Sequence, residues 1–143
     1  MKTLVISLLA VGLVAGLVCG CQTTAKAKGP SDQELINKVV ADWKTAATAK
    51  DLDKVMALYS EAFKHSEYGD KAGMKSFIKD AIDMGYMENA VVNTANAKVT
   101  IEKDKANVYP IELKAAFGSA TIKMDLKKEA AGWKIIGMDI EQS

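Results

Sequence analysis

Only a few residues of this chain have the types and spacing that chemistry requires. His65 is the single histidine, which excludes a metal site built from several imidazoles. The sequence contains no serine nucleophile elbow, no phosphate-binding glycine loop and no zinc-ligand spacing. Its two cysteines, Cys19 and Cys21, both follow an apolar N-terminal stretch. We therefore expect no metal and no cofactor, and the cysteines are the first residues whose chemistry has to be explained.

Cys21 ends an N-terminal segment that resembles the lipobox of bacterial lipoproteins. The segment opens with a basic residue, Leu4–Val18 is almost wholly apolar, and Gly20 is the small residue that precedes an acylated cysteine. Cleavage before Cys19 is disfavoured because a branched valine stands directly before it. The resemblance implies that residues 1–20 are a lipoprotein signal peptide and that Cys21 is the lipidated N-terminus.

Two other interpretations of this segment stay open, a retained anchor helix and a secretory signal without lipidation. The apolar stretch of about 15 residues is shorter than the about 20 residues that a membrane-spanning helix needs, which favours cleavage. A lipoprotein cysteine carries several acyl chains, such as palmitate, and two or more chains anchor a protein stably. Gln22 stands where inner-membrane lipoproteins have a retention Asp, so we expect anchoring in the outer membrane, facing the periplasm.

Removal of the signal peptide leaves a chain with balanced charge. Loss of Lys2 reduces the 19 basic residues to 18, which equals the 18 acidic residues. All basic residues are Lys, so neither a basic excess nor an Arg fork is present, and we expect no nucleic-acid partner. Residues 21–31 lack hydrophobic periodicity and contain Gly29-Pro30, which predicts a flexible tether. Residues 32–143 are long enough for one domain.

Apolar residues at helical spacing predict three helices at the start of the domain. Ser31 and Glu34 form a capping-box pattern before the first helix. Asp51 can cap the second helix, and Gly85 is placed to end the third. The apolar stripes of the three helices are Leu35–Ala47, Leu52–Tyr59 and Met74–Ile82, and a short strand is predicted at Phe63–Tyr68.

Beyond the third helix the apolar period changes to two, which predicts an antiparallel meander. Pro110 indicates an edge or a bulge in one of its strands. Alternate residues of that strand, from Tyr109 to Phe117, are predicted to share one face. Helices followed by a curved sheet define an α+β fold. The four predicted strands are centred on Ala95–Ile101, Tyr109–Phe117, Ala120–Leu126 and Trp133–Ile140.

In element order and in short motifs, residues 32–143 resemble the nuclear transport factor 2-like superfamily. That superfamily includes ketosteroid isomerase, scytalone dehydratase and SnoaL-type polyketide cyclases. The resemblance implies a cone-shaped α+β barrel, in which three N-terminal helices pack on a curved antiparallel sheet and leave a pocket at the wide end. It also implies a homodimer, since many members are dimers. The motifs are the hairpin from Trp43 through Asp51 to Tyr59, the run Tyr59-Ser60-Glu61-Ala62-Phe63, and Gly132-Trp133-Lys134-Ile135-Ile136.

The resemblance also assigns candidate site residues. The isomerase branch uses a Tyr as oxyanion donor, an acidic base, and a protonated acid on a late strand. Trp43 matches the Tyr position, Glu67 the base and Met124 the second acid, so Glu67 is the candidate catalytic residue. Tyr59 and Tyr109 can each place a hydroxyl in a pocket, although an amphipathic core edge explains them equally well. The predicted pocket residues are Trp43, Tyr59, Tyr109 and Met124.

Two functions from different classes are consistent with these residues. The first is a tethered module that binds a small apolar ligand, a peptide or a partner protein. The second is a cofactor-free isomerase, dehydratase or cyclase-like enzyme in which Glu67 moves a proton in an apolar pocket. Because the partners of Glu67 in the isomerase branch are missing here, the sequence favours the binding module.

We predict that mature protein begins at acylated Cys21 and fractionates with membranes. Cys21→Ser removes the acceptor of the acyl chains and should release the protein into the soluble fraction. Cell fractionation and intact-mass analysis check this prediction. Retention of the variant in the membrane, together with no lipid mass on the wild-type protein, would contradict it.

Overall fold

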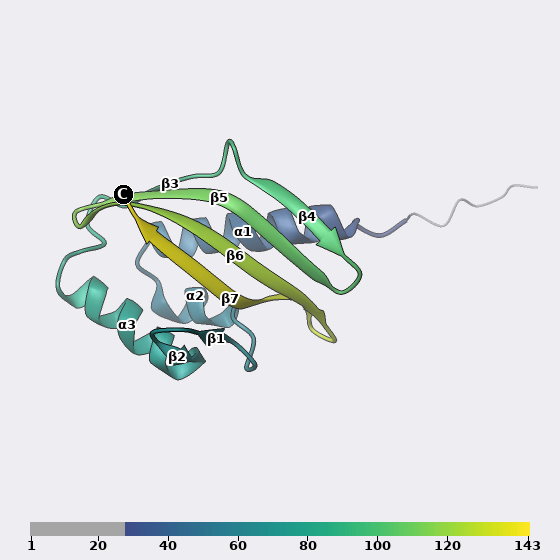
Figure 1. Ribbon diagram of the computed structural model, residues 1–143, viewed down its shortest axis with the longest axis horizontal. Helices are drawn as coiled ribbons and strands as arrows, with labels where there is room; N and C mark the ends of the chain where they lie inside the picture. Colours follow the sequence, from purple (N-terminus) through teal and green to yellow (C-terminus); the bar gives the residue numbers. More distant parts are fainter. Residues whose placement is uncertain (1–27) are drawn as a thin grey trace, which may run out of the picture.

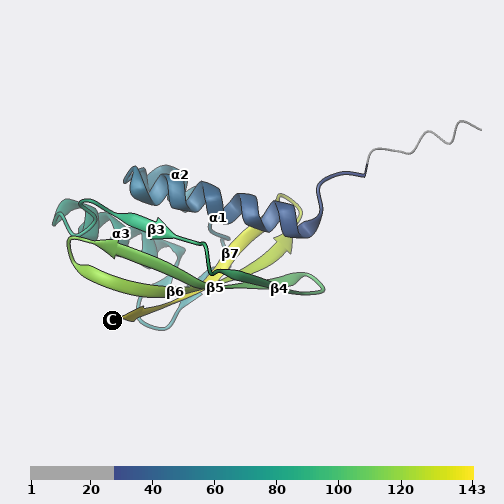
Figure 2. The ribbon, with the colours of Figure 1, turned by 90° about the horizontal axis from the view of Figure 1, so that it is seen from above.

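Three helices lie on one face of a curved antiparallel sheet (Figures 1 and 2). The computed structural model describes residues 28–143 of the chain. Within that range no helix is both long and apolar enough to cross a membrane. This arrangement confirms the α+β fold expected from the change of apolar period. The helices are α1 (Asp32–Thr48), α2 (Leu52–Ala57) and α3 (Lys71–Asp83).

The sheet has the order β3-β5-β6-β7, and β4 pairs with the same edge of β5 as β3 does. All of these pairings are antiparallel. A separate small hairpin replaces the single strand predicted at Phe63–Tyr68; it consists of β1 (Lys64–His65) and β2 (Gly69–Asp70). The sheet strands are β3 (Val91–Asn93), β4 (Lys98–Glu102), β5 (Lys105–Ala115), β6 (Gly118–Glu129) and β7 (Gly132–Gln142).

The helices begin where local sequence satisfies their free N–H groups. The Ser31 hydroxyl accepts from the Glu34 N–H at 3.3 Å, and the Glu34 carboxylate accepts from the Ser31 N–H at 2.7 Å, which completes the predicted capping box. At the starts of α2 and α3 the Asp51 and Asp70 side chains accept from the Lys54 and Gly73 N–H groups. Gly85, with φ of 77°, follows α3 as predicted, because this backbone conformation suits glycine.

The first predicted strand is wrong in its extent, since the edge strand of the sheet is broken in two. The Asn93 side-chain oxygen accepts from the Ala95 N–H at 3.0 Å, and the Ala97 N–H donates to the Thr94 carbonyl at 3.1 Å. These bonds make a turn between β3 and β4. Alternation of apolar residues here reflects a turn followed by a strand, so local side-chain bonding overrides the period.

A register shift in β5 overturns the prediction that Tyr109 shares a face with Ile111. Val108 pairs with Met124 and Ile111 pairs with Ile122, so the bulged strand has an extra residue between these pairs. Val108 and Ile111 are both buried, whereas the Tyr109 side chain is 45 % exposed on the opposite face. Phe117, predicted on the same strand face, lies in the turn after β5 and packs against the core.

Asp32 connects the N-terminus of α1 to the hairpin of β6 and β7 through hydrogen bonds. Its carboxylate accepts from the Trp133 indole N–H at 3.0 Å and from the Lys128 ammonium at 2.8 Å. Trp133 is buried in the core, so Asp32 supplies the partner that its indole N–H requires. The hydrogen bonds from Lys128 and Trp133 hold the pKa of Asp32 below its usual value.

We predict that Asp32 stabilises the fold in a pH-dependent way. Because its folded-state pKa is lowered, its contribution is complete above the unfolded pKa of 3.8 and is lost as pH falls through the folded value. Asp32→Asn should lower the free energy of unfolding at pH 7, and Asp32→Ala should lower it further because Trp133 then lacks an acceptor. Denaturant unfolding at pH 7 and pH 3 measures both differences, which should shrink at pH 3.

Asp53→Asn is the matched control, because the Asp53 side chain is 93 % exposed and its nearest cation, on Lys75, is 3.8 Å away. It should change stability less than either Asp32 variant. Equal effects of the Asp32 and Asp53 variants would show that the link to Trp133 contributes nothing.

Candidate functional site

An apolar cavity of about 240 Å³ lies at the end of the domain where α1 ends. It is enclosed by α1, α2, α3, the loop after α3, the turn between β5 and β6, and the last residues of β7. In Figure 1 these elements meet near the C-terminus, at the end of the molecule opposite residue 28. Its lining includes Trp43, Ala47, Phe77, Ala81, Met87 and Phe117.

The stripe of α3 supplies much of the cavity wall. Of its apolar residues only Met74 is fully buried, while Phe77, Ile78, Ala81 and Ile82 are half-buried. The last four residues all line the cavity. α3 packs on α2 and β2, and the rest of its apolar stripe faces the cavity.

The rim of the cavity is a loop that backbone hydrogen bonds hold in place. The Phe117 N–H donates to the Tyr86 carbonyl at 3.3 Å, and the Ala116 N–H donates to the Glu88 carbonyl at 3.0 Å. Tyr86 and Met87 line the cavity, and the Tyr86 side chain is 50 % exposed. The loop after α3 and the turn after β5 therefore form one connected rim.

Few polar groups face this cavity. Among residues 28–143, Lys50 is the only charged residue in its lining, and the other polar side chains belong to Tyr86, Gln142 and Trp43. The Trp43 indole N–H is buried and has no hydrogen-bond partner among the described residues. No carboxylate from the described part of the chain lines the cavity. The site can bind an apolar molecule, and it lacks an acidic side chain that could serve as a general base.

The structure brings only one of the predicted pocket residues to the cavity. Trp43 lines it. Tyr59 and Met124 are buried in the core, where the Tyr59 hydroxyl donates to the Met138 sulfur at 3.7 Å. Burial raises the pKa of Tyr59, so its phenol stays neutral. Tyr109 lies on the outer face of the sheet, because the bulge in β5 shifts the alternation of the strand.

Glu67 lies outside the cavity, in the exposed turn between β1 and β2. Its backbone N–H donates to the His65 Nδ1 at 3.0 Å, so the single histidine stabilises this turn. The Tyr68 ring stacks on Phe77 with 3.9 Å between centroids. Partial burial and the nearby Glu67 carboxylate raise the pKa of Tyr68. Glu67 is therefore positioned against a tyrosine and not against an apolar ligand site.

Most of the cavity lining was not predicted as site residues. Phe77, Ala81 and Phe117 are apolar residues that the sequence assigns to a core, and Met87 and Gln142 carry no motif. The available signal was the apolar stripe of α3, most of whose residues the structure leaves half-buried.

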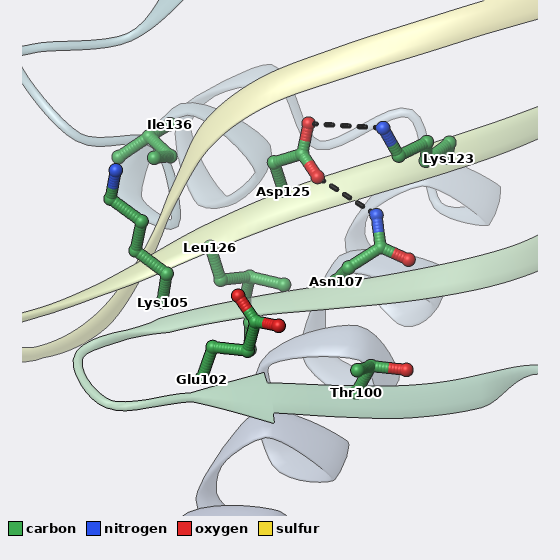
Figure 3. Close-up of a pocket in the computed structure, with 9 residues that line it drawn as sticks. Thr100, Glu102, Lys105, Asn107, Lys123, Asp125, Leu126 and Ile136 are labelled. Carbon is green, nitrogen blue, oxygen red and sulfur yellow. Dashed lines mark hydrogen bonds and ion pairs between the residues drawn. The ribbon is translucent and has the colours of Figure 1, made fainter.

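A second hollow, of about 560 Å³, lies on the outer face of the sheet (Figure 3). Its polar side chains interact with one another: Asp125 accepts from the Asn107 amide at 2.8 Å and pairs with Lys123 at 3.8 Å. Within residues 28–143 no three His, Cys, Asp or Glu side chains gather as metal ligands. The outer hollow is thus a solvated, charge-balanced surface, and the apolar cavity is the better candidate site.

Comparison with known proteins shows the fold alone. No family model and no curated protein matches the sequence. Among solved structures, a cystatin-like-fold protein from Nostoc punctiforme is similar with a TM-score of 0.65 and 16 % identity, over 78 % of this chain and 90 % of that chain. A nuclear transport factor 2-like protein from Pseudomonas putida gives a TM-score of 0.63 and 14 % identity, over 74 % and 82 %. A de novo designed protein with a curved sheet gives 0.59 and 13 %, over 74 % and 98 %.

These likenesses place the described domain in the nuclear transport factor 2-like fold, as the element order predicts. This architecture hosts many unrelated activities, so function has to be argued from the cavity and its lining.

We predict that Glu67→Gln leaves both the free energy of unfolding and ligand binding in the cavity unchanged, because Glu67 is exposed and does not line the cavity. Thermal unfolding and titration with the neutral probe octan-1-ol measure the two effects. A proton-abstraction activity that disappears in this variant, with the fold intact, would instead establish Glu67 as a catalytic base.

Proposed function

We propose that this protein is a lipid-anchored binding protein of the bacterial cell envelope, whose domain holds a small apolar ligand in the cavity beside α3. The observation that carries the proposal is an apolar cavity whose wall is formed largely by the half-buried apolar stripe of α3. The N-terminal segment ending at Cys21 supports the location, because it resembles a lipoprotein signal.

The cavity volume sets the size of the ligand. A water molecule occupies about 30 Å³ in the liquid, so 240 Å³ corresponds to about eight non-hydrogen atoms. Each buried methylene contributes about 0.8 kcal/mol, which gives about 6 kcal/mol before the entropic cost of association. Even before that cost is subtracted, about 6 kcal/mol corresponds to a dissociation constant of about 40 µM, so a ligand of this size binds in about the millimolar range or more weakly.

The chemistry of the lining favours binding over catalysis. A general base must lie within hydrogen-bond reach of the proton that it abstracts. No carboxylate lines the cavity, and Glu67 is exposed outside it. The enzyme alternative therefore has no observation in its favour, whereas the apolar wall directly supports the binding of an apolar molecule.

We predict that Ala81→Phe abolishes binding by filling the cavity. Ala81 lines the cavity from α3, so a benzyl group there occupies the space of the ligand without replacing a packed side chain. Octan-1-ol affinity, measured by calorimetric or NMR titration, should fall by more than about tenfold, which corresponds to the loss of about two buried methylenes.

The control is Ser76→Phe, which adds a phenyl ring to the exposed face of the same helix. It should leave octan-1-ol binding unchanged. Thermal unfolding verifies that both variants are folded. The proposed function is wrong if folded Ala81→Phe binds octan-1-ol as the wild-type protein does, or if the wild-type protein does not bind it.

A further inference from the structure

We propose that the ligand of this cavity is an apolar monocarboxylate, whose body fills the cavity and whose carboxylate pairs with the Lys50 ammonium at the mouth. The inference rests on the proposed function and adds to it the chemical class of the ligand. It is carried by the position of Lys50, by its backbone conformation and by its present partner.

Lys50 provides the only charge in an otherwise neutral lining. Its side chain is 35 % exposed, so the ammonium lies at the mouth, where one end of a ligand reaches solvent. An apolar wall with a single cation at its opening is complementary to a molecule with one anionic end. A ligand carboxylate can pair with this ammonium in place of its present partner, Glu88, whereas a neutral apolar ligand makes no ion pair with it.

The backbone of Lys50 is held in a conformation that favours glycine. Lys50 follows α1 with φ of 56°, and its N–H donates to the Ala47 carbonyl at 3.1 Å while the Asp51 N–H donates to the Ala46 carbonyl at 2.9 Å. This is the position after a helix at which glycine is usual, since a side chain there is strained. The sequence keeps a lysine at a strained position, and its side chain lines the cavity mouth. Because strained backbone conformations cluster at functional sites, the conformation of Lys50 supports a functional role for its side chain.

Glu88 occupies the place that a ligand carboxylate takes. It belongs to the rim loop, its side chain is 53 % exposed, and it forms an ion pair with Lys50. An exposed ion pair contributes little to stability, so exchange of one carboxylate for another is inexpensive. Glu88 therefore keeps the cation compensated when the cavity is empty and competes with the ligand for it.

The experiment compares octanoate with octan-1-ol, which have the same number of carbons and differ in charge. Their eight carbons match the size of the cavity. Affinities are measured by calorimetric titration at low salt for the wild-type protein, Lys50→Met and Glu88→Gln. Lys50→Met should weaken the binding of octanoate about two- to fivefold more than the binding of octan-1-ol, as expected for the loss of one exposed ion pair. Glu88→Gln should strengthen octanoate binding by removing the competitor.

Lys103 offers a matched control for the backbone argument. It also has a positive φ, of 55°, but it lies in the turn between β4 and β5, away from the cavity. Lys50→Gly and Lys103→Gly both relieve a strained conformation, so neither should lower the melting temperature. Only Lys50→Gly should weaken octanoate binding.

Two results would overturn the monocarboxylate assignment while the cavity function stands. One is unchanged octanoate affinity in folded Lys50→Met, and the other is an equal loss for octanoate and octan-1-ol in that variant. Failure of the proposed function looks different, because then Ala81→Phe does not affect the binding of either probe.

Discussion

The bend of the sheet is the constraint on which the rest of the structure depends. Two register shifts produce it, one in β5 between Val108 and Ile111, and one where Asp125 pairs with Gly137 while Leu126 pairs with Ile135. Each shift inserts an extra residue, which bends the strand and increases its twist. Figure 2 shows the curved sheet beneath the helices. At the end of the curved sheet where β5 turns into β6 and β7 ends, the apolar stripe of α3 lines the open space of the cavity.

The fold was predictable where the signals are local. The capping box at Ser31, the helical stripes and the three long strands β5, β6 and β7 all follow from residues within a few positions of one another. The errors arise where side chains or bulges interrupt a period. Asn93 bonds to the backbone and breaks the edge strand, and the β5 bulge turns Tyr109 to the outer face. Pro110 indicated a bulge from the sequence. It did not indicate whether the residues before it or after it keep the expected face of the strand.

The cavity was much less predictable than the fold, because it is defined by space that side chains do not fill. Its lining comes from α1, α2, α3, two loops and the end of β7, which are brought together only by the tertiary structure. Trp43 was predicted as a pocket residue because it stands at the position of the oxyanion-donor Tyr in the superfamily that the sequence resembles. Lys50 carries no motif, and its backbone conformation is visible only in three dimensions. Residues transferred from an enzyme branch by position, such as Glu67 and Met124, fell on a turn and in the core.

The direction of α1 separates the two ends of the domain. Its 17 residues rise about 1.5 Å each, so about 25 Å of helix lie between Asp32 and the cavity mouth near Lys50. Residues 28–31 join the helix at the end away from the cavity (Figure 1). The opening of the cavity therefore lies at the opposite end of the domain from residue 28, where the preceding chain joins it.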